Sequence, residues 1–287
     1  MKRMNINVRG KLMDLAHPRV MGIINITENS FFQGSRHLDD DDILSVASAM
    51  LEDGADILDI GGCSTRPGSD EVPEPVERER VCRAVKLVMN RFPDAVISVD
   101  TYRAAVAAAA VEDCGASIIN DISGGTLDEG MFPLVMKLNV PYILMHMQGT
   151  PRTMQMEPHY DDVVADILAW FSGRMAPLRA AGVKDIILDP GFGFGKNAGH
   201  NFEMLRRFSE FSAAGMPLLA GLSRKTMIWK TLGVTPDLAL NGTTALNMTA
   251  LMNGASILRV HDVNEARQVV KLFEKIYPAG VQFDHYS

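Results

Sequence analysis

Cysteine is scarce in this 287-residue sequence, which contains only Cys63, Cys82 and Cys114. An odd number of cysteines with no Cys-x-x-Cys spacing gives no support for a disulfide framework or for a thiolate zinc site. The pattern is typical of a protein that works in a reducing compartment. It predicts a cytoplasmic location.

Long apolar runs are also missing, because no uncharged stretch approaches the roughly 18 residues that a membrane span requires. The first ten residues, MKRMNINVRG, are basic but lead into no apolar segment, so no secretory signal is predicted. We therefore expect a soluble chain that has no membrane partner.

Positive charge is not in excess either, since the formal net charge is −7. A nucleic acid held through its phosphates needs a basic face on the protein, so a nucleic-acid partner is not expected. With 47% apolar residues, the chain can bury one large core. Small molecules are the expected ligands.

The sequence does contain a series of short runs rich in Val, Ile and Leu. Near-continuous apolar runs of this kind are typical of parallel strands that are covered on both faces. The predicted strands are Val20–Ile24, Asp56–Ile60, Val96–Val99, Ser117–Asn120, Pro141–Met145, Asp185–Leu188, Pro217–Ala220 and Ser256–Arg259.

Helical patterns alternate with these strands. In the clearest one, Asp39–Asp42 can cap the helix, apolar residues from Ile43 to Leu51 share one face, and Gly54 supplies the stop. The other predicted helices span residues 75–90, 103–113, 129–138, 160–181, 200–214, 238–253 and 263–276. Eight strands alternating with eight helices predict a (β/α)8 barrel of the TIM type.

The barrel domain is predicted to span residues 19–287 as a single domain. Residues 1–18 precede it, with Ile6 and Val8 alternating on one side of Arg9-Gly10 and Leu12 on the other. This pattern predicts a hairpin extension that covers the bottom of the barrel.

Polar residues stand at the carboxyl ends of the predicted strands, where TIM barrels build their active sites. Because these ends converge, we expect one pocket that contains residues from all eight strands. The residues at the strand ends include Asn25, Thr65, Arg66, Asp100, Asn120, His146, Asp189, Ser223, Lys225, Arg259 and His261.

The residue types favour a particular kind of ligand. Asp100, Asn120, Asp189 and Lys225 suit a flat heterocycle with donor and acceptor edges, whereas Arg66, Arg259 and His261 suit a phosphate.

Each residue also has a simpler interpretation. An Asp after a strand, such as Asp100 or Asp189, is often only a helix cap or turn residue. His146 is more often a core histidine than a catalyst. The glycine-rich run from Asp189 to Lys196 fits no phosphate-loop spacing, so flexibility beside the pocket is the safer expectation.

Several longer stretches resemble the signatures of dihydropteroate synthases. In chain order they are Met21–Phe31, Asp59–Gly68, Ser98–Thr101, Ile119–Gly125, Met145–Pro151, Asp189–Lys196, Gly221–Lys225 and Arg259–Asp262. The similarity covers almost the whole chain from Val20, with one match for each predicted strand.

The resemblance implies the synthesis of 7,8-dihydropteroate from a pterin pyrophosphate and p-aminobenzoate. It places the pterin ring against Asp100, Asn120, Asp189 and Lys225, with Ile122 and Met145 as apolar walls. It assigns the pyrophosphate to Arg66, Arg259 and His261 with a Mg²⁺ ligated by Asn25. It assigns p-aminobenzoate to a site bordered by Thr65, Pro67, Phe194, Ser223 and Lys225, and it counts Gly221 among the substrate-binding residues. The catalytic residues would be Asp100, Lys225, Arg259 and His261, in an enzyme that forms a homodimer.

One departure from the family pattern lies in the first loop, where Glu28 and Asn29 replace the usual Pro and Asp. This change affects a loop thought to close over the reacting centre. Two alternatives remain open on the sequence: a methyltetrahydrofolate-dependent corrinoid methyltransferase, and a non-catalytic pterin-binding paralogue. Arg66, Lys225, Arg259 and His261 argue against the methyltransferase, because they have no evident role without a pyrophosphate.

Overall fold

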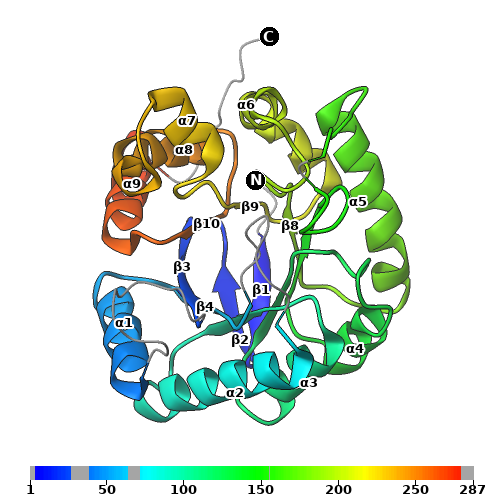
Figure 1. Cartoon of the computed structure of the whole chain (residues 1–287), viewed down its shortest axis with the longest axis vertical. Coiled ribbons are helices and arrows are strands. Elements are labelled where there is room, and N and C mark those ends of the chain that lie inside the picture. The colour runs from blue at the N-terminus through cyan, green and yellow to red at the C-terminus, as the bar shows by residue number, and fades with distance from the viewer. Residues whose placement is uncertain (1–3, 27–38, 64–71, 155, 279–287) are drawn as a thin grey trace.

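Eight parallel strands form the wall of a nearly closed barrel in a computed structural model that describes residues 4–26, 39–63, 72–154 and 156–278. The strand order is β8-β7-β6-β5-β4-β3-β10-β9, so strands that are consecutive in the sequence are neighbours and the last strand pair adjoins the first strand of the barrel. A parallel bridge between Leu188 and Leu218 brings β8 and β9, the two edges of the sheet, together (Figure 1). The strands are β3 (Arg19–Asn25), β4 (Ile57–Gly61), β5 (Ile97–Asp100), β6 (Ile118–Asp121), β7 (Tyr142–Met145), β8 (Ile186–Asp189), β9 (Leu219–Ala220) and β10 (Ile257–Val260). Each predicted strand is present, and the TIM-barrel prediction is confirmed.

Helices surround this barrel, as Figure 1 shows. They are α1 (Asp40–Glu52), α2 (Glu74–Arg91), α3 (Ala104–Glu112), α4 (Met131–Leu138), α5 (Val163–Ala180), α6 (Ala198–Arg206), α7 (Thr226–Leu232), α8 (Leu240–Met252) and α9 (Val263–Ile276). Within the described residues, no helix is both long enough and apolar enough to cross a membrane.

The structure differs from the predicted helices in two places. The helix expected over residues 200–214 ends at Arg206, and the 3₁₀ helix η1 (Phe208–Ala214) follows it. Phe208 and Phe211 are both buried, and their spacing of three residues matches the period of a 3₁₀ turn. Between β9 and β10 the chain forms two helices rather than one, because α7 stops at Gly233 in the left-handed conformation before η2 (Pro236–Leu238) and α8 begin.

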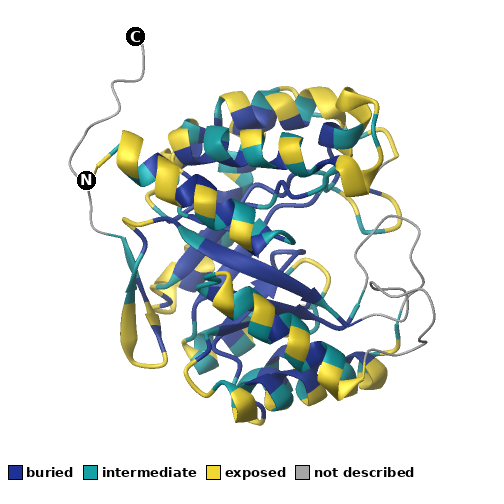
Figure 2. Ribbon diagram, turned by 90° about the vertical axis from the view of Figure 1, so that its left-hand side faces the viewer, coloured by how far each residue is buried: buried dark blue, intermediate teal, exposed yellow. Residues whose placement is uncertain are grey.

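The N-terminal hairpin covers the amino end of the barrel, as predicted. Strands β1 (Asn5–Val8) and β2 (Lys11–Asp14) pair across Arg9 and Gly10, whose φ angles of 52° and 79° suit a tight two-residue turn. Ile6, Val8 and Leu15 join a buried cluster with the first inward-facing residues of the barrel strands, including Ile57 and Ile143. Figure 2 shows the buried side of this hairpin toward the barrel and its exposed side toward solvent.

The hairpin therefore contributes to the stability of the barrel, and Ile6→Ala tests this contribution. Ile6 is 1% exposed, so its truncation should lower the free energy of unfolding by about 2–5 kcal/mol. Leu12→Ala in the paired strand is the matched control, because Leu12 is 73% exposed and should change stability by less than about 0.5 kcal/mol. Urea titrations of both variants would measure the difference, and equal losses would show that the hairpin is not packed on the barrel.

Candidate functional site

A pocket lies at the carboxyl ends of the barrel strands, and it unites residues that are far apart in the sequence. Nine residues predicted for the site line it, joined by Gly191 and Phe192: Asp100, Asn120, Ile122, Met145, Asp189, Phe194, Gly221, Lys225 and Arg259. The free cavity is only about 20 Å³, close to the room needed for one water molecule.

An arginine and two carboxylates form the centre of the pocket. Arg259 Nε donates to Asp59 Oδ2 at 2.6 Å, and Arg259 Nη2 donates to Asp100 Oδ2 at 2.5 Å. Asn120 Nδ2 also donates to Asp59 Oδ2, at 3.0 Å. Asp59 is fully buried, so the network orients Asn120 and Arg259 toward the inside of the barrel.

Asp100 has a carboxylate oxygen that is ready to accept a hydrogen bond. Its Oδ1 is buried and has no partner among the residues that the structure describes. Such an oxygen costs free energy until a donor reaches it. Burial raises the pKa of Asp100 to about 7, although the charge of Arg259 opposes the rise. A ligand with an N–H edge would satisfy Oδ1 and favour the ionised carboxylate.

Asp189 and Lys225 occupy the other side of the pocket. Asp189 Oδ1 accepts from the Gly191 backbone N–H at 2.7 Å, which fixes the carboxylate at the end of β8. Burial raises the pKa of Asp189, while this hydrogen bond and the charge of Lys225 oppose the rise. Burial and the charge of Arg259 lower the pKa of Lys225 to about 8, so its ammonium form still predominates at neutral pH. The Lys225 Nζ lies 4.3 Å from the centre of the Phe194 ring.

The glycine-rich loop after β8 is buried and tied down, contrary to the flexibility expected from its composition. Lys196, 2% exposed, donates to the backbone oxygens of Gly191 at 3.1 Å and Phe194 at 2.9 Å. Its third partner is His146 Nδ1 at 3.0 Å. These acceptors match the three protons of an ammonium group, although burial lowers the pKa of Lys196 to about 7. The loop thus holds Asp189 and Phe194 in place.

Gly191 is required in this loop for two reasons. Its φ of +72° is unfavourable for other residues, and an added Cβ would lie only 2.1 Å from the backbone oxygen of His146. The close approach joins the loop to the strand end that carries His146.

His146 is a core histidine, in agreement with the simpler interpretation of the sequence. It is 6% exposed, and its ring packs edge-on against Trp170 with centroids 5.0 Å apart. Burial and the charge of Lys196 lower its pKa to about 2, so the imidazole is neutral. In this state Nδ1 accepts a hydrogen bond from Lys196 Nζ.

Ser223 and His261 form a second group beside the pocket. Ser223 Oγ lies 3.0 Å from His261 Nδ1 and accepts from the His261 backbone N–H at 3.2 Å. Burial and the charges of Arg259 and Arg224 lower the pKa of His261 to about 4. The surroundings of this pair are therefore electropositive, as an anion site requires.

Arg259 and His261, both expected to contact a phosphate, make different contacts in the structure. Arg259 pairs with Asp59 and Asp100 in the pocket, and His261 contacts Ser223 beside it. Ser223 lies in the turn before α7, whose N-cap is Lys225.

Part of the predicted site lies outside the described residues. Thr65, Arg66 and Pro67 in the second loop belong to this part, as do Glu28 and Asn29 in the first. Asn25, at the end of β3, is described, and its amide oxygen borders Gly61 together with the side chain of Asp100.

Sequence reasoning missed the roles of Asp59 and Lys196. Asp59 is a charged residue inside an otherwise apolar strand, a pattern that indicates a buried ion pair. Lys196 ends the glycine-rich run, where a lysine can satisfy the backbone oxygens that a tight loop exposes. These two features could have identified both residues.

The fold and the pocket define a class of protein that binds a polar ring at the mouth of a TIM barrel, and residues 21–261 match the family described as "Pterin binding enzyme". The chain is 42% identical to the dihydropteroate synthase of Escherichia coli K12, an alignment that covers 94% of this chain and 96% of that protein. It belongs to the dihydropteroate synthase family.

Solved structures agree with this relationship. The Yersinia pestis dihydropteroate synthase in complex with a sulfonamide drug superposes with a TM-score of 0.89 at 42% identity, covering 95% of this chain and 98% of that one. The Xanthomonas albilineans dihydropteroate synthase with 4-aminobenzoic acid gives a TM-score of 0.88 at 36% identity, covering 96% and 98%.

Lys196→Met tests whether the loop after β8 needs its buried lysine. The change leaves the Gly191 and Phe194 carbonyls without their donor, at a cost of roughly 1–3 kcal/mol. We expect the KM for the pterin substrate to rise about tenfold, which corresponds to roughly 1.4 kcal/mol. Steady-state kinetics would measure it, with the exposed Lys184→Met, just before β8, as the matched control. An unchanged KM in the Lys196 variant would show that the loop holds its shape without this residue.

Proposed function

We propose that this chain joins p-aminobenzoate to 6-hydroxymethyl-7,8-dihydropterin pyrophosphate, which yields 7,8-dihydropteroate and pyrophosphate. The observation that carries the proposal is the single pocket formed by Asp100, Asn120, Asp189, Lys225 and Arg259. Its carboxylates match the N–H edge of an amino-pyrimidinone ring, and its lysine matches the ring carbonyl. Ser223 and His261 lie beside it, close to the cations Arg224, Lys225 and Arg259.

The pterin ring would form hydrogen bonds with three polar side chains of the pocket. The free oxygen of Asp100 and the carboxylate of Asp189 would accept from ring N–H groups, and Lys225 would donate to the carbonyl. Ile122 and Met145 would contact the faces of the ring. Binding in this way removes the unsatisfied oxygen of Asp100, which favours ligand over water.

Pyrophosphate would leave from the side of the ring that faces Arg259 and His261, and the family resemblance adds Arg66 to its contacts. The carbon–oxygen bond breaks first, and the arylamine nitrogen of p-aminobenzoate then attacks the exocyclic carbon and loses a proton. Negative charge grows on the leaving oxygen in this step, so nearby cations stabilise the transition state more than the bound substrate. No side chain needs to act as a nucleophile.

The donor set near Asn25 suits Mg²⁺. The described residues contain no cluster of three or more His, Cys, Asp or Glu ligands, so an all-protein metal cage is not expected there. Mg²⁺ keeps several waters and commonly binds one or two protein oxygens together with phosphate oxygens. We propose that Asn25 supplies one oxygen ligand to a Mg²⁺ held mainly by the pyrophosphate. When bound, the ion would neutralise charge on the leaving group.

We further propose that p-aminobenzoate binds between Thr65, Pro67, Phe194 and Ser223, in a cytoplasmic homodimer. Five apolar side chains on α7, η2, α8 and α9 support the dimer, because they are exposed in the single chain. They are Leu232, Leu238, Met252, Leu272 and Ile276. Sedimentation velocity would test the oligomeric state.

Ser223→Ala tests the position of p-aminobenzoate. Loss of one hydrogen bond to its carboxylate should raise the KM for p-aminobenzoate about 5–30-fold, which corresponds to roughly 1–2 kcal/mol, with the pterin affinity nearly unchanged. Initial rates with each substrate varied in turn would separate the two effects. An equal rise in both KM values would contradict the assignment.

The proposed function as a whole is tested by the release of pyrophosphate from the two substrates in the presence of Mg²⁺. The purified chain should form 7,8-dihydropteroate and pyrophosphate in equal amounts. A chain that binds the pterin but forms no product would be a non-catalytic paralogue.

A further inference from the structure

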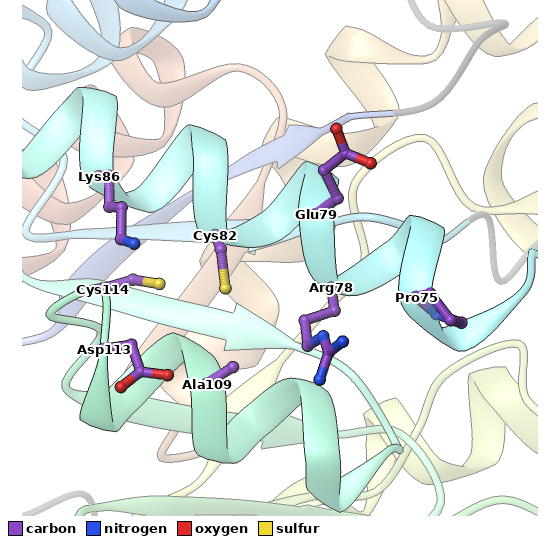
Figure 3. Close-up of a pocket in the computed structure, with 8 residues that line it drawn as sticks. All are labelled: Pro75, Arg78, Glu79, Cys82, Lys86, Ala109, Asp113 and Cys114. Carbon is purple, nitrogen blue, oxygen red and sulfur yellow. The ribbon is translucent and has the colours of Figure 1, made fainter.

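A groove lies between α2 and the α3 segment, on the outside of the barrel and away from the pocket at the strand ends. Its volume is about 430 Å³. Figure 3 shows that its lining combines two cations, two carboxylates and two thiols, which are Arg78, Lys86, Glu79, Asp113, Cys82 and Cys114. None of these residues takes part in the function proposed above.

Cys82 and Cys114 meet in this groove from different elements. Cys82 lies on α2 and is half-buried, whereas Cys114 follows α3 directly and is 7% exposed. In Figure 3 the Cys114 sulfur points toward the α2 face that carries Cys82. Both thiols line the same groove, and burial raises the pKa of Cys114 to about 12, with the neighbouring Cys82 thiol adding to the rise.

We propose that Cys82 and Cys114 are a redox-active thiol pair that forms a disulfide between α2 and the turn after α3. Its oxidant would be a small zwitterionic disulfide, such as glutathione disulfide. The cations of Arg78 and Lys86 match the carboxylates of such a molecule, and Glu79 and Asp113 match its ammonium group. A volume of about 430 Å³ accommodates a ligand of this size class.

The reaction would proceed by two thiol–disulfide exchanges. The Cys82 thiolate attacks one sulfur of the small disulfide, which forms a mixed disulfide and releases one small thiolate that takes up a proton. Cys114 then loses its proton and attacks the Cys82 sulfur, which releases the second small thiol. Two protein thiols are oxidised, and one small disulfide is reduced to two thiols.

The surroundings of the two residues set the order of attack. Cys82 is the more exposed, so it meets the small disulfide first. Cys114 is held protonated by its buried position, although the nearby Lys86 opposes this effect. Since only the thiolate attacks, the second exchange should be the slower one, and its rate should rise with pH.

The experiment uses the full chain with Cys63→Ser, so that only the two groove cysteines remain. After incubation with glutathione disulfide, free thiols are titrated in denaturant and the intact mass is measured. We expect both thiols to be lost, the mass to fall by two hydrogen atoms, and the chain to stay monomeric on a non-reducing gel. Dithiothreitol should restore both thiols.

A second variant and the unmodified chain complete the test. Cys63→Ser combined with Cys114→Ser should stop at a stable mixed disulfide on Cys82. Peptide mapping of the oxidised unmodified chain should find Cys82 linked to Cys114, which guards against misfolding of the variants. A mixed disulfide that never resolves in the two-cysteine chain, a disulfide between two chains, or two unreacted thiols would each overturn the proposal.

Discussion

Arg259→Ala is expected to lower kcat by about 10²-fold or more, in the range found when one preorganised donor is removed from a developing oxyanion. Arg259 lines the pterin pocket, where its ion pairs to Asp59 and Asp100 hold it. Its charge is most useful when the leaving oxygen becomes negative. Single-turnover measurements with the pterin pyrophosphate would give the effect on the chemical step.

The same substitution should also weaken binding of the free pterin. Without Arg259, Asp100 loses the cation that lowers its pKa most while the charge of Asp59 still raises it, so the pKa of Asp100 rises further and its carboxylate becomes protonated. Breaking this buried pair should also cost about 3–5 kcal/mol of stability. Calorimetric titration and urea unfolding would measure these two effects.

Arg267→Ala is the matched control for Arg259→Ala. Arg267 lies on α9 and pairs with Asp56 at 2.5 Å, at the amino end of the barrel. Its loss should reduce stability and leave kcat unchanged. If the two variants lost the same fraction of kcat at temperatures where both are folded, the loss would come from the barrel as a whole, and a role for Arg259 in turnover would be wrong.

Asp189→Asn is expected to weaken pterin binding by more than about 100-fold, which corresponds to roughly 3 kcal/mol for hydrogen bonds to a charged group. Asn keeps the size of the side chain and can still accept from Gly191 N–H. Its other terminal atom becomes a donor, and it would face the donors of Lys225 and the ring. Calorimetric titration with the pterin would measure the change in affinity.

Asp185→Asn provides the comparison, since Asp185 stands just before the amino end of the same strand β8. It should bind the pterin as tightly as the unmodified chain. Wild-type affinity in Asp189→Asn would remove this residue from the pterin site.

The sequence was sufficient to predict the strands and the positions of the polar residues at their ends. The reason is physical: buried parallel strands require apolar runs, and their carboxyl ends must meet in a barrel. The hairpin at Arg9 and Gly10 could be predicted from a different pattern, because Ile6 and Val8 alternate with polar residues and face the core.

Side-chain pairing across the barrel could not be predicted in the same way. The partners Arg259 and Asp59 are 200 residues apart, and which carboxylate attracts the guanidinium depends on the positions of several strands together. The glycine-rich loop posed a related difficulty. Its composition indicates flexibility, but Lys196 ties it down through contacts that only the folded chain brings together.

Formation of 7,8-dihydropteroate tests the central claim most directly. The purified chain is mixed with 6-hydroxymethyl-7,8-dihydropterin pyrophosphate, p-aminobenzoate and Mg²⁺, and both products are quantified by chromatography. We predict one pyrophosphate released for each dihydropteroate formed, with the rate reduced about 10²-fold or more in Arg259→Ala. Tighter binding of methyltetrahydrofolate than of the pterin pyrophosphate, with no pyrophosphate released, would contradict the account and indicate a methyltransferase.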